Sequence, residues 1–250
     1  MRRGSSARRD GSSNTCVPPK PSPEAIRIAE TVNQPFSLTI AYHGAGVLSL
    51  RQGDLSTAIP LLERGLGLCQ AGSVSHVFAA LAVALGVAYA LCGRVAETLP
   101  LLEHVAGPST SIRWPQYVSP FLWVGEASLL AGCLEDAMLL ACRALEHACA
   151  RKERGYQAHA LWLRGEIAMH HEPPMVEQAE HDYRQALALA EELGMRPLLA
   201  HCHRGLGILC GRMGRRAQTR AALSTAIELY RALGMTFWLS RAETALTQMA

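Results

Sequence analysis

The sequence is poor in aromatic residues and lacks strand-like runs. Phe, Trp and Tyr make up 6% of the 250 residues, whereas 49% of the residues are apolar, with Leu and Ala dominant. Val, Ile and Thr never cluster into the runs that strands need. Because Leu and Ala favour helix, we expect an all-α protein with enough apolar surface for a substantial core.

Paired cysteines are also missing. The eight cysteines are spaced singly and no Cys-x-x-Cys pair occurs, which argues against a zinc site or a thioredoxin-type redox motif. Cys69, Cys92, Cys142 and Cys210 lie among apolar residues of predicted helices. We interpret them as buried reduced thiols of a cytosolic protein and expect neither a metal nor another cofactor.

No apolar run is long enough to cross a membrane. The longest one, Val77 to Cys92, has 16 residues, fewer than the ~20 that a bilayer requires, and we interpret it as a buried helix. The arginine-rich N-terminal residues contain no apolar stretch of the secretory kind. We therefore expect a cytoplasmic protein without a membrane partner.

Charge of one sign is concentrated only near the N-terminus. Residues 1–23 carry four arginines and one lysine against Asp10, which leaves 19 of the 24 basic and 20 of the 21 acidic residues for the rest of the chain. A near-neutral body provides no general field for nucleic acid. Because residues 1–23 are also rich in proline and polar residues, we expect a disordered tail there and a helical domain over residues 24–250.

A period of about 40 residues runs through this domain. The tripeptide Leu-Gly-Met occurs at 193–195 and again at 233–235. Small residues recur at similar intervals at three positions: Gly46, Gly86, Gly125, Gly165 and Gly207; Ala58, Thr98, Ala137, Ala179 and Thr219; and Gly65, Val105, Ala144, Ala186 and Ala226. Small side chains let two helices approach closely. Val105 is the poorest match, so the second repeat is expected to be the less closely packed.

Recurring glycines also mark the turn between the two helices of most repeats. In four of the five repeats a glycine lies five residues before the second small position: Gly53, Gly93, Gly132 and Gly214. A positive φ at these glycines would end one helix and begin the next. In the fourth repeat Pro173 and Pro174 interrupt the helical pattern instead. We predict five helix pairs over residues 36–233 and a capping helix over residues 236–248.

Both copies of Leu-Gly-Met follow a long predicted helix. We interpret Gly194 and Gly234 as the residues just after a helix C-terminus, with the flanking Leu and Met in apolar contact across the turn. The tripeptide then marks a repeat boundary rather than an active site. Beyond the second copy, Phe237 and Trp238 form an apolar end that could pair two molecules, and the sequence leaves the oligomeric state open.

These helix pairs, with their small residues, resemble the tetratricopeptide repeat (TPR) family. The resemblance implies a right-handed α-solenoid in which the first helix of each pair lines an inner groove. The chain departs from the family in three ways. Its period is near 40 rather than 34, the aromatic residue of the first helix survives only as Tyr89, and the proline between repeats is absent.

Residues 176–246 most clearly resemble the C-terminal repeat region of bacterial signalling proteins, in which a class III nucleotide cyclase or a DNA-binding domain accompanies an AAA-type ATPase. This resemblance implies a non-enzymatic scaffold for protein–protein interaction in bacterial signalling. A detached regulatory fragment of such a cyclase, ATPase or transcriptional regulator is the first alternative. The sequence has no Gly-x-x-x-x-Gly-Lys-Ser/Thr phosphate loop, so the family's chemistry does not carry over.

The inner groove is predicted to have a mixed histidine, arginine and tryptophan surface. Counted from the first glycine of each repeat, its residues are His43, Val47, His159, Trp162, Glu166, His170, His201, Arg204 and Arg212. Such a surface suits a protein or peptide partner with some acidic character. The arginines around Arg212 suit the same partner or a solvated turn, and Trp162 is equally compatible with a core position.

Two clusters leave a second alternative, a Cys/His metal-dependent enzyme. His201, Cys202 and His203 are neighbours on one predicted helix, where residues i and i+2 point about 200° apart and do not converge on one metal. Glu166 and His170 share a helix face, which suits an acid–base pair or an exposed helix end. Both clusters are better explained without catalysis.

Overall fold

The computed structural model describes residues 23–32, 34–72, 75–106 and 119–249. Over these residues the chain is all-helical, without a strand. The helices are α1 (Pro23–Val32), α2 (Pro35–Gln52), α3 (Leu55–Gly72), α4 (Ser75–Leu91), α5 (Val95–Ala106), α6 (Ser119–Leu130), α7 (Leu134–Ala150), α8 (Arg154–His170), α9 (Val176–Glu192), α10 (Arg196–Arg212), α11 (Arg216–Leu233) and α12 (Thr236–Met249). The predicted disordered tail lies almost entirely outside the described residues.

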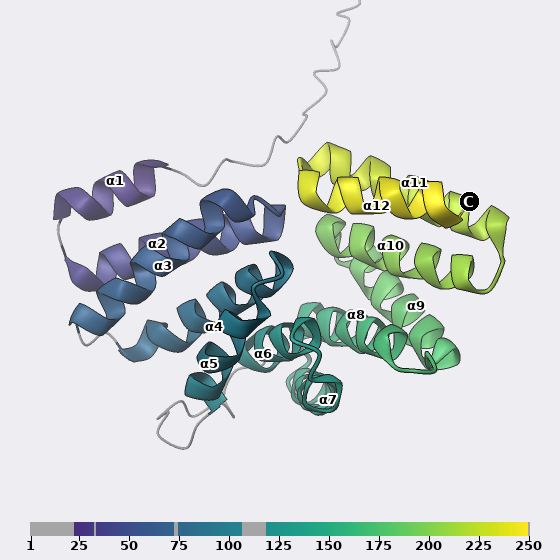
Figure 1. Ribbon diagram of the computed structural model, residues 1–250, viewed down its shortest axis with the longest axis horizontal. Coiled ribbons are helices and arrows are strands. Elements are labelled where there is room, and N and C mark those ends of the chain that lie inside the picture. Colours follow the sequence, from purple (N-terminus) through teal and green to yellow (C-terminus); the bar gives the residue numbers. More distant parts are fainter. Residues whose placement is uncertain (1–22, 33, 73–74, 107–118, 250) are drawn as a thin grey trace, which may run out of the picture.

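Consecutive helices pack against each other in pairs, from α2 with α3 to α10 with α11, and α12 packs on α11. The all-α prediction is confirmed, and the predicted capping segment is the helix α12. The pairs follow one another around an arch that runs from α1 through α6–α8 to α12 (Figure 1).

The recurring glycines lie on the first helix of each pair, and all except Gly125 have their nearest neighbour on its second helix; a Cβ at Gly125 would lie nearest to Leu163 of α8, at 3.1 Å. A Cβ atom at Gly165 would lie 2.8 Å from the Tyr183 ring, and one at Gly207 would lie 2.7 Å from Leu223. The contact is similarly close at Gly46. The alanines at the second and third small positions are completely buried: Ala58, Ala137, Ala144, Ala179, Ala186 and Ala226.

The pair of α4 and α5 makes a wider contact at its glycine. A Cβ at Gly86 would meet the Thr98 methyl group at 3.5 Å, an ordinary van der Waals distance. The Thr98 hydroxyl instead donates a hydrogen bond of 3.0 Å to the Gly86 carbonyl oxygen. Val105 is completely buried in the same pair.

The turn glycines adopt the predicted conformation. The φ angles are +81° at Gly53, +80° at Gly93, +84° at Gly132 and +72° at Gly214, and the glycines of the two Leu-Gly-Met copies are also left-handed, at +64° and +67°. Between α7 and α8 the left-handed residue is Lys152, with a φ of 59°, so this boundary is formed without glycine.

Gly234 ends α11 with a Schellman motif. Its N–H donates to the Arg231 carbonyl oxygen at 3.2 Å, and the Met235 N–H donates to the Tyr230 carbonyl oxygen at 3.0 Å. We expect Gly234→Val to lower the free energy of unfolding by about 1–3 kcal/mol, because a β-branched residue is strained at positive φ. Urea denaturation followed by circular dichroism measures this, with Gly234→Asn as the tolerated control. Equal midpoints for both variants would contradict the assignment.

The two residues beside each Leu-Gly-Met glycine behave differently. Met235 is buried and Leu233 packs against the same core, as predicted. In the first copy Met195 packs inward, but Leu193 is 42% exposed. Leu193 is therefore largely turned to solvent and does not pack in the core as Leu233 does, and the apolar contact across the first turn stays a prediction.

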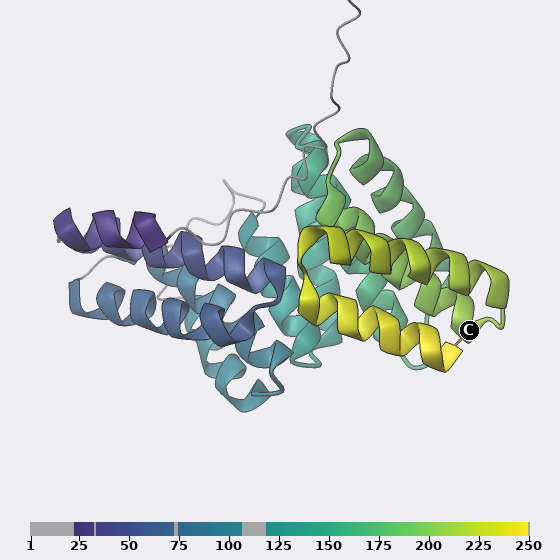
Figure 2. The same ribbon diagram turned by 90° about the horizontal axis from the view of Figure 1, so that it is seen from above.

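The two arms of the arch touch each other. A Cβ at Gly53, in the turn between α2 and α3, would lie 2.5 Å from the Phe237 Cβ atom on α12. Both views show the α2–α3 turn beside the beginning of α12 (Figures 1 and 2). Trp238 is 9% exposed. The chain's own α2–α3 turn therefore contacts the apolar end that the sequence suggested for pairing two molecules.

None of the described helices is long and apolar enough to cross a membrane. The apolar run that begins at Val77 forms most of α4 and is largely buried. Cys69 and Cys210 are buried free thiols, as predicted, whereas Cys142 is only partly buried and Cys92 is exposed. The prediction was wrong for Cys92 because α4 ends at Leu91 and leaves the thiol in the turn.

Candidate functional site

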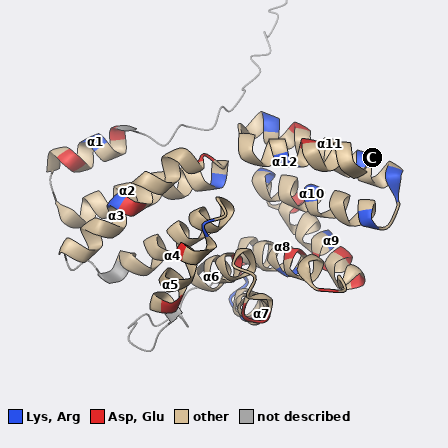
Figure 3. Cartoon of the chain, viewed as in Figure 1, with Lys and Arg blue, Asp and Glu red and all other residues tan. Residues whose placement is uncertain are grey.

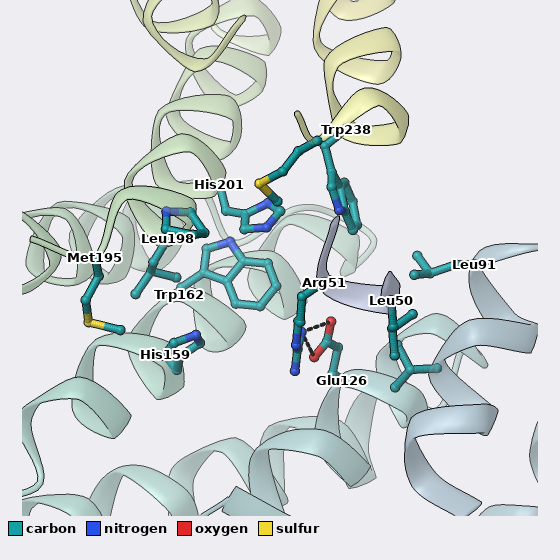
Figure 4. A pocket seen from close by; sticks show the side chains of 13 residues that line it. Leu50, Arg51, Leu91, Glu126, His159, Trp162, Met195, Leu198, His201 and Trp238 are labelled. Carbon is teal, nitrogen blue, oxygen red and sulfur yellow. Dashed lines mark hydrogen bonds and ion pairs between the residues drawn. The ribbon is translucent and has the colours of Figure 1, made fainter. Parts of the chain in front are cut away.

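A pocket of about 350 Å³ lies between the two arms of the arch (Figure 4). It is lined by residues from the first helix of every pair, namely α2, α4, α6, α8 and α10, and from α12. The helices reach the same space because the first helices follow one another along the inside of the arch. Its volume is at the lower end of the range for small-molecule sites.

Three of the predicted groove residues line this pocket: His159, Trp162 and His201. His159 and Trp162 lie one turn apart on α8, and His201 lies on α10. Trp162 is 8% exposed, so it belongs both to the core and to the pocket wall. The remaining groove residues lie elsewhere.

An ion pair between distant residues forms one side of the pocket. Nη1 of Arg51, at the end of α2, donates to both carboxylate oxygens of Glu126 on α6, at 2.9 and 3.1 Å. The Arg51 guanidinium carbon also lies 4.0 Å from the Trp123 ring centroid, in cation–π geometry. Arg51 is thus fixed from two directions and links the beginning of the arch to its middle.

His201 lies between two tryptophans on the opposite side. Its ring centroid is 5.4 Å from that of Trp162 and 4.9 Å from that of Trp238. Nδ1 is 2.8 Å from the Tyr230 hydroxyl. Burial, followed by the charges of Arg204 and Arg51, holds the pKa of His201 well below its usual value, so the imidazole is neutral near pH 7.

His159 completes the polar side of the pocket. Its Nδ1 is 3.1 Å from the Gly155 carbonyl oxygen, one turn earlier on α8. Burial and the neighbouring Arg51 charge lower the pKa of His159. Both pocket histidines are therefore uncharged at neutral pH, and the Arg51–Glu126 pair carries the formal charge at the pocket surface.

Two indole N–H groups have no partner within the part of the chain that the structure describes. Nε1 of Trp162 and Nε1 of Trp238 are both buried and make no hydrogen bond to any described residue. Buried donors are normally satisfied, and leaving one unpaired costs free energy. Figure 4 shows both indoles gathered with the His201 ring at one side of the pocket.

Glu166 and Arg204, also predicted to line the groove, form a buried pair instead. Nη2 of Arg204 donates to one Glu166 oxygen at 2.8 Å, and the Tyr183 hydroxyl donates to the other at 2.7 Å. Burial and the Glu166 charge raise the pKa of Tyr183 well above its usual value. This network joins α8, α9 and α10 and is not among the residues that line the pocket.

The other predicted residues lie outside the pocket. His43 is half-buried on α2, where burial lowers its pKa, and Val47 packs against the core. His170 is exposed at the end of α8, and its Nδ1 contacts the Glu166 backbone oxygen at 2.8 Å. The contact that an acid–base pair with the Glu166 carboxylate would need is not formed.

Arg212 is held at the end of α10 and donates to the Met169 carbonyl oxygen at 2.9 Å. Figure 3 shows basic residues around the α10–α11 turn, and Arg215 in this turn pairs with Glu180 at 3.3 Å. Cys202 is completely buried beside His201. Among the described residues, no group of three or more His, Cys, Asp or Glu side chains is placed to hold a metal.

Sequence reasoning missed most of the pocket wall. Arg51, Glu126 and Trp238 line it, but their separation in sequence gives no sign that they meet. Met195 and Met235 also line it, and here a signal existed. The methionine of each Leu-Gly-Met copy follows the glycine that ends a helix, so both copies direct a methionine to the inside of the arch.

No protein-family model matches this sequence, and no curated protein is significantly similar to it.

Proposed function

We propose that the chain is a non-enzymatic interaction module of the TPR type, a right-handed solenoid of five helix pairs closed by α12. This proposal is supported by the regular packing of the helix pairs. Four of the five recurring glycines, Gly46, Gly86, Gly165 and Gly207, have their nearest neighbour on the second helix of their own pair, and the first helices share one inner surface. In a repeat protein such an inner surface is the usual place for a partner.

One observation carries the proposal: the first helices converge on a pocket whose polar groups are held in place rather than poised for reaction. Arg51 is paired with Glu126, and His201 with Tyr230. The indole donors of the two tryptophans remain unpartnered. Fixed charges with unsatisfied donors are suited to recognition, and no serine, threonine, cysteine or lysine is among the described residues that line the pocket.

We infer from the sequence resemblance that the module is cytoplasmic and regulatory in bacterial signalling. Its partner would be a protein or peptide with some acidic character that covers the mouth of the pocket. Pro197 is exposed and lines the pocket, so it lies at this mouth. A partner seated there would contact the beginning of α10.

A photo-crosslinker tests this position. With p-benzoylphenylalanine in place of Pro197, irradiation of cells is expected to give a discrete protein adduct on gel electrophoresis. The control is the same substitution at Tyr156, which is exposed on α8 but does not line the pocket. Adducts of equal intensity at both positions, or at Tyr156 alone, would contradict a partner at the pocket mouth.

A second candidate, a detached regulatory module of a larger signalling ATPase or cyclase, is favoured by the end of the arch near α1. Four large apolar side chains are more than 40% exposed there: Ile28, Val32, Phe36 and Ile40. Solenoid ends are normally polar or capped. An apolar end of this kind suits stacking against a further helix pair or an accompanying domain.

A further inference from the structure

The pocket presents more hydrogen-bond donors than acceptors. The indole N–H groups of Trp162 and Trp238 are buried without partners among the described residues, and both residues line the pocket. An indole nitrogen can only donate. The one carboxylate in the pocket wall, Glu126, is occupied by Arg51. Both indoles therefore require an acceptor that the described part of the chain does not supply.

The hydrogen bonds around His201 assign a third donor. The positive charge of Arg204 acts on the Tyr230 phenol, which favours a lone pair of the hydroxyl oxygen, rather than its proton, on the side of the guanidinium. The Tyr230 proton is then free to point at Nδ1 of His201, 2.8 Å away. In a neutral ring with Nδ1 as the acceptor, Nε2 carries the proton. Nε2 has no partner among the described residues.

The surroundings of these donors are electropositive. The guanidinium carbons of Arg204 and Arg241 lie 5.7 and 5.9 Å from the Trp238 ring centroid. Arg204 is neutralised by Glu166, whereas Arg241 stacks on Phe237 at 4.4 Å and forms no ion pair within the described residues. The excess charge near the donors is positive, which favours an anionic acceptor over a neutral one.

The rest of the wall is apolar. Leu50, Val87 and Leu91 line the pocket from α2 and α4, and Leu198 and Met235 line it from the opposite arm. A volume of about 350 Å³ admits a compact molecule but not a folded segment. The methionine is adaptable in shape and suits an aromatic or branched neighbour.

We propose that this pocket binds a small organic acid, a carboxylate on a compact aromatic or branched aliphatic body. The carboxylate oxygens accept hydrogen bonds from Nε1 of Trp162, Nε1 of Trp238 and Nε2 of His201, and the body lies against the apolar wall. The proposal rests on the proposed function as a binding module and adds a ligand to it. Residues of both arms of the arch line the pocket. The bound acid would therefore contact both arms, next to the place where Gly53 and Phe237 already touch.

Calorimetric titration of the full chain with phenylacetate and with phenylacetamide tests the proposal. The two probes share a shape and differ in charge. Phenylacetate is expected to bind with one-to-one stoichiometry and at least about tenfold more tightly than the amide, because hydrogen bonds to a charged acceptor are the stronger ones. It should also raise the melting temperature by mass action.

Two variants remove one donor each and keep an aromatic ring. Trp162→Phe and Trp238→Phe are each expected to weaken phenylacetate binding about tenfold, with circular dichroism confirming the helical fold. Tyr156→Phe is the matched control, since it removes an exposed hydroxyl from α8 outside the pocket, and it should leave the affinity unchanged. If one tryptophan variant does not fold, the other still decides the result.

Three results would overturn the proposal: equal affinity for acid and amide, affinity that both tryptophan variants retain, or no binding of either phenylacetate or 4-methylpentanoate up to their solubility limits. Tighter binding of the peptide Ala-Ala-Ala-Phe than of phenylacetate would also overturn it, since the carboxylate would then belong to a peptide end. The crosslinker at Pro197 reports separately on the proposed function, so either proposal can fail alone.

Discussion

Replacing Arg204 with methionine is expected to lower the free energy of unfolding by about 3–5 kcal/mol. The side chains of Arg204 and Glu166 are only 13% and 12% exposed. Methionine fills the space of the arginine stem but leaves the Glu166 carboxylate buried with the Tyr183 hydroxyl as its remaining hydrogen-bond partner. An uncompensated buried charge is among the costliest single defects in a protein.

A double-mutant cycle identifies the cause of this loss. Glu166→Gln keeps an acceptor for Tyr183 and removes the charge, so the double variant with Arg204→Met should recover most of the stability that either single variant loses. Chemical denaturation measures all four proteins. Arg231→Met is the control, because Arg231 pairs with Glu243 at the surface, where ion pairs contribute little. Additive losses in the cycle would show that the pair is not coupled.

The helix pairs and their turns were largely predictable because their signals are local. A residue of positive φ, most often glycine, ends one helix and lets the next begin at once, so Gly53, Gly93 and Gly132 mark turns without knowledge of the fold. Small residues recur for a similar reason, since close axial approach excludes a large side chain at Gly46 and Gly207. Each signal depends on neighbours within one helix pair.

The pocket was only partly predictable because it depends on the curvature of the whole arch. His159, Trp162 and His201 come from consecutive first helices, and a constant repeat geometry is enough to place them together. Arg51 pairs with Glu126, which lies two repeats further along the chain. Trp238 lines the same pocket as Leu50 and Arg51 of α2 only because the two arms of the arch come together. Small changes of angle at each pair accumulate along the chain, and no local pattern in the sequence records their sum.

Glu166 and Trp162, which the helical period assigned to the same groove, occupy different environments in the structure. Glu166 follows Trp162 by one turn of α8, so both were assigned to the groove. In the structure the Tyr183 hydroxyl and Arg204 draw the Glu166 side chain into the interface with α9 and α10, while Trp162 stays at the pocket. Helical period places two residues on the same face, but the partners of each residue decide whether its polar atoms meet solvent, ligand or core.

The neighbours of each residue also predict opposite effects on stability when glycine is replaced by alanine at two equivalent repeat positions, 165 and 86. Gly165→Ala should lower the free energy of unfolding by about 1–3 kcal/mol, because its new Cβ would lie 2.8 Å from Cδ1 and Cε1 of Tyr183 and overpack a rigid ring. Tyr183 has no room to retreat, since a Cβ at Gly205 would lie 2.5 Å from its Cζ atom. Gly86→Ala, with 3.5 Å to Thr98, should instead raise stability by about 0.5–1 kcal/mol through helix propensity.

Denaturation of both alanine variants measures the difference, and a smaller side chain at position 183 identifies its origin. In a Tyr183→Leu background the clash is removed, so Gly165→Ala should cost much less there than in the natural chain. If Gly165→Ala costs the same in both backgrounds, the aromatic ring is not what keeps position 165 a glycine. A loss of stability for Gly86→Ala as large as that for Gly165→Ala would show that helix pairs α4–α5 and α8–α9 are equally close, against the spacing observed at their glycines.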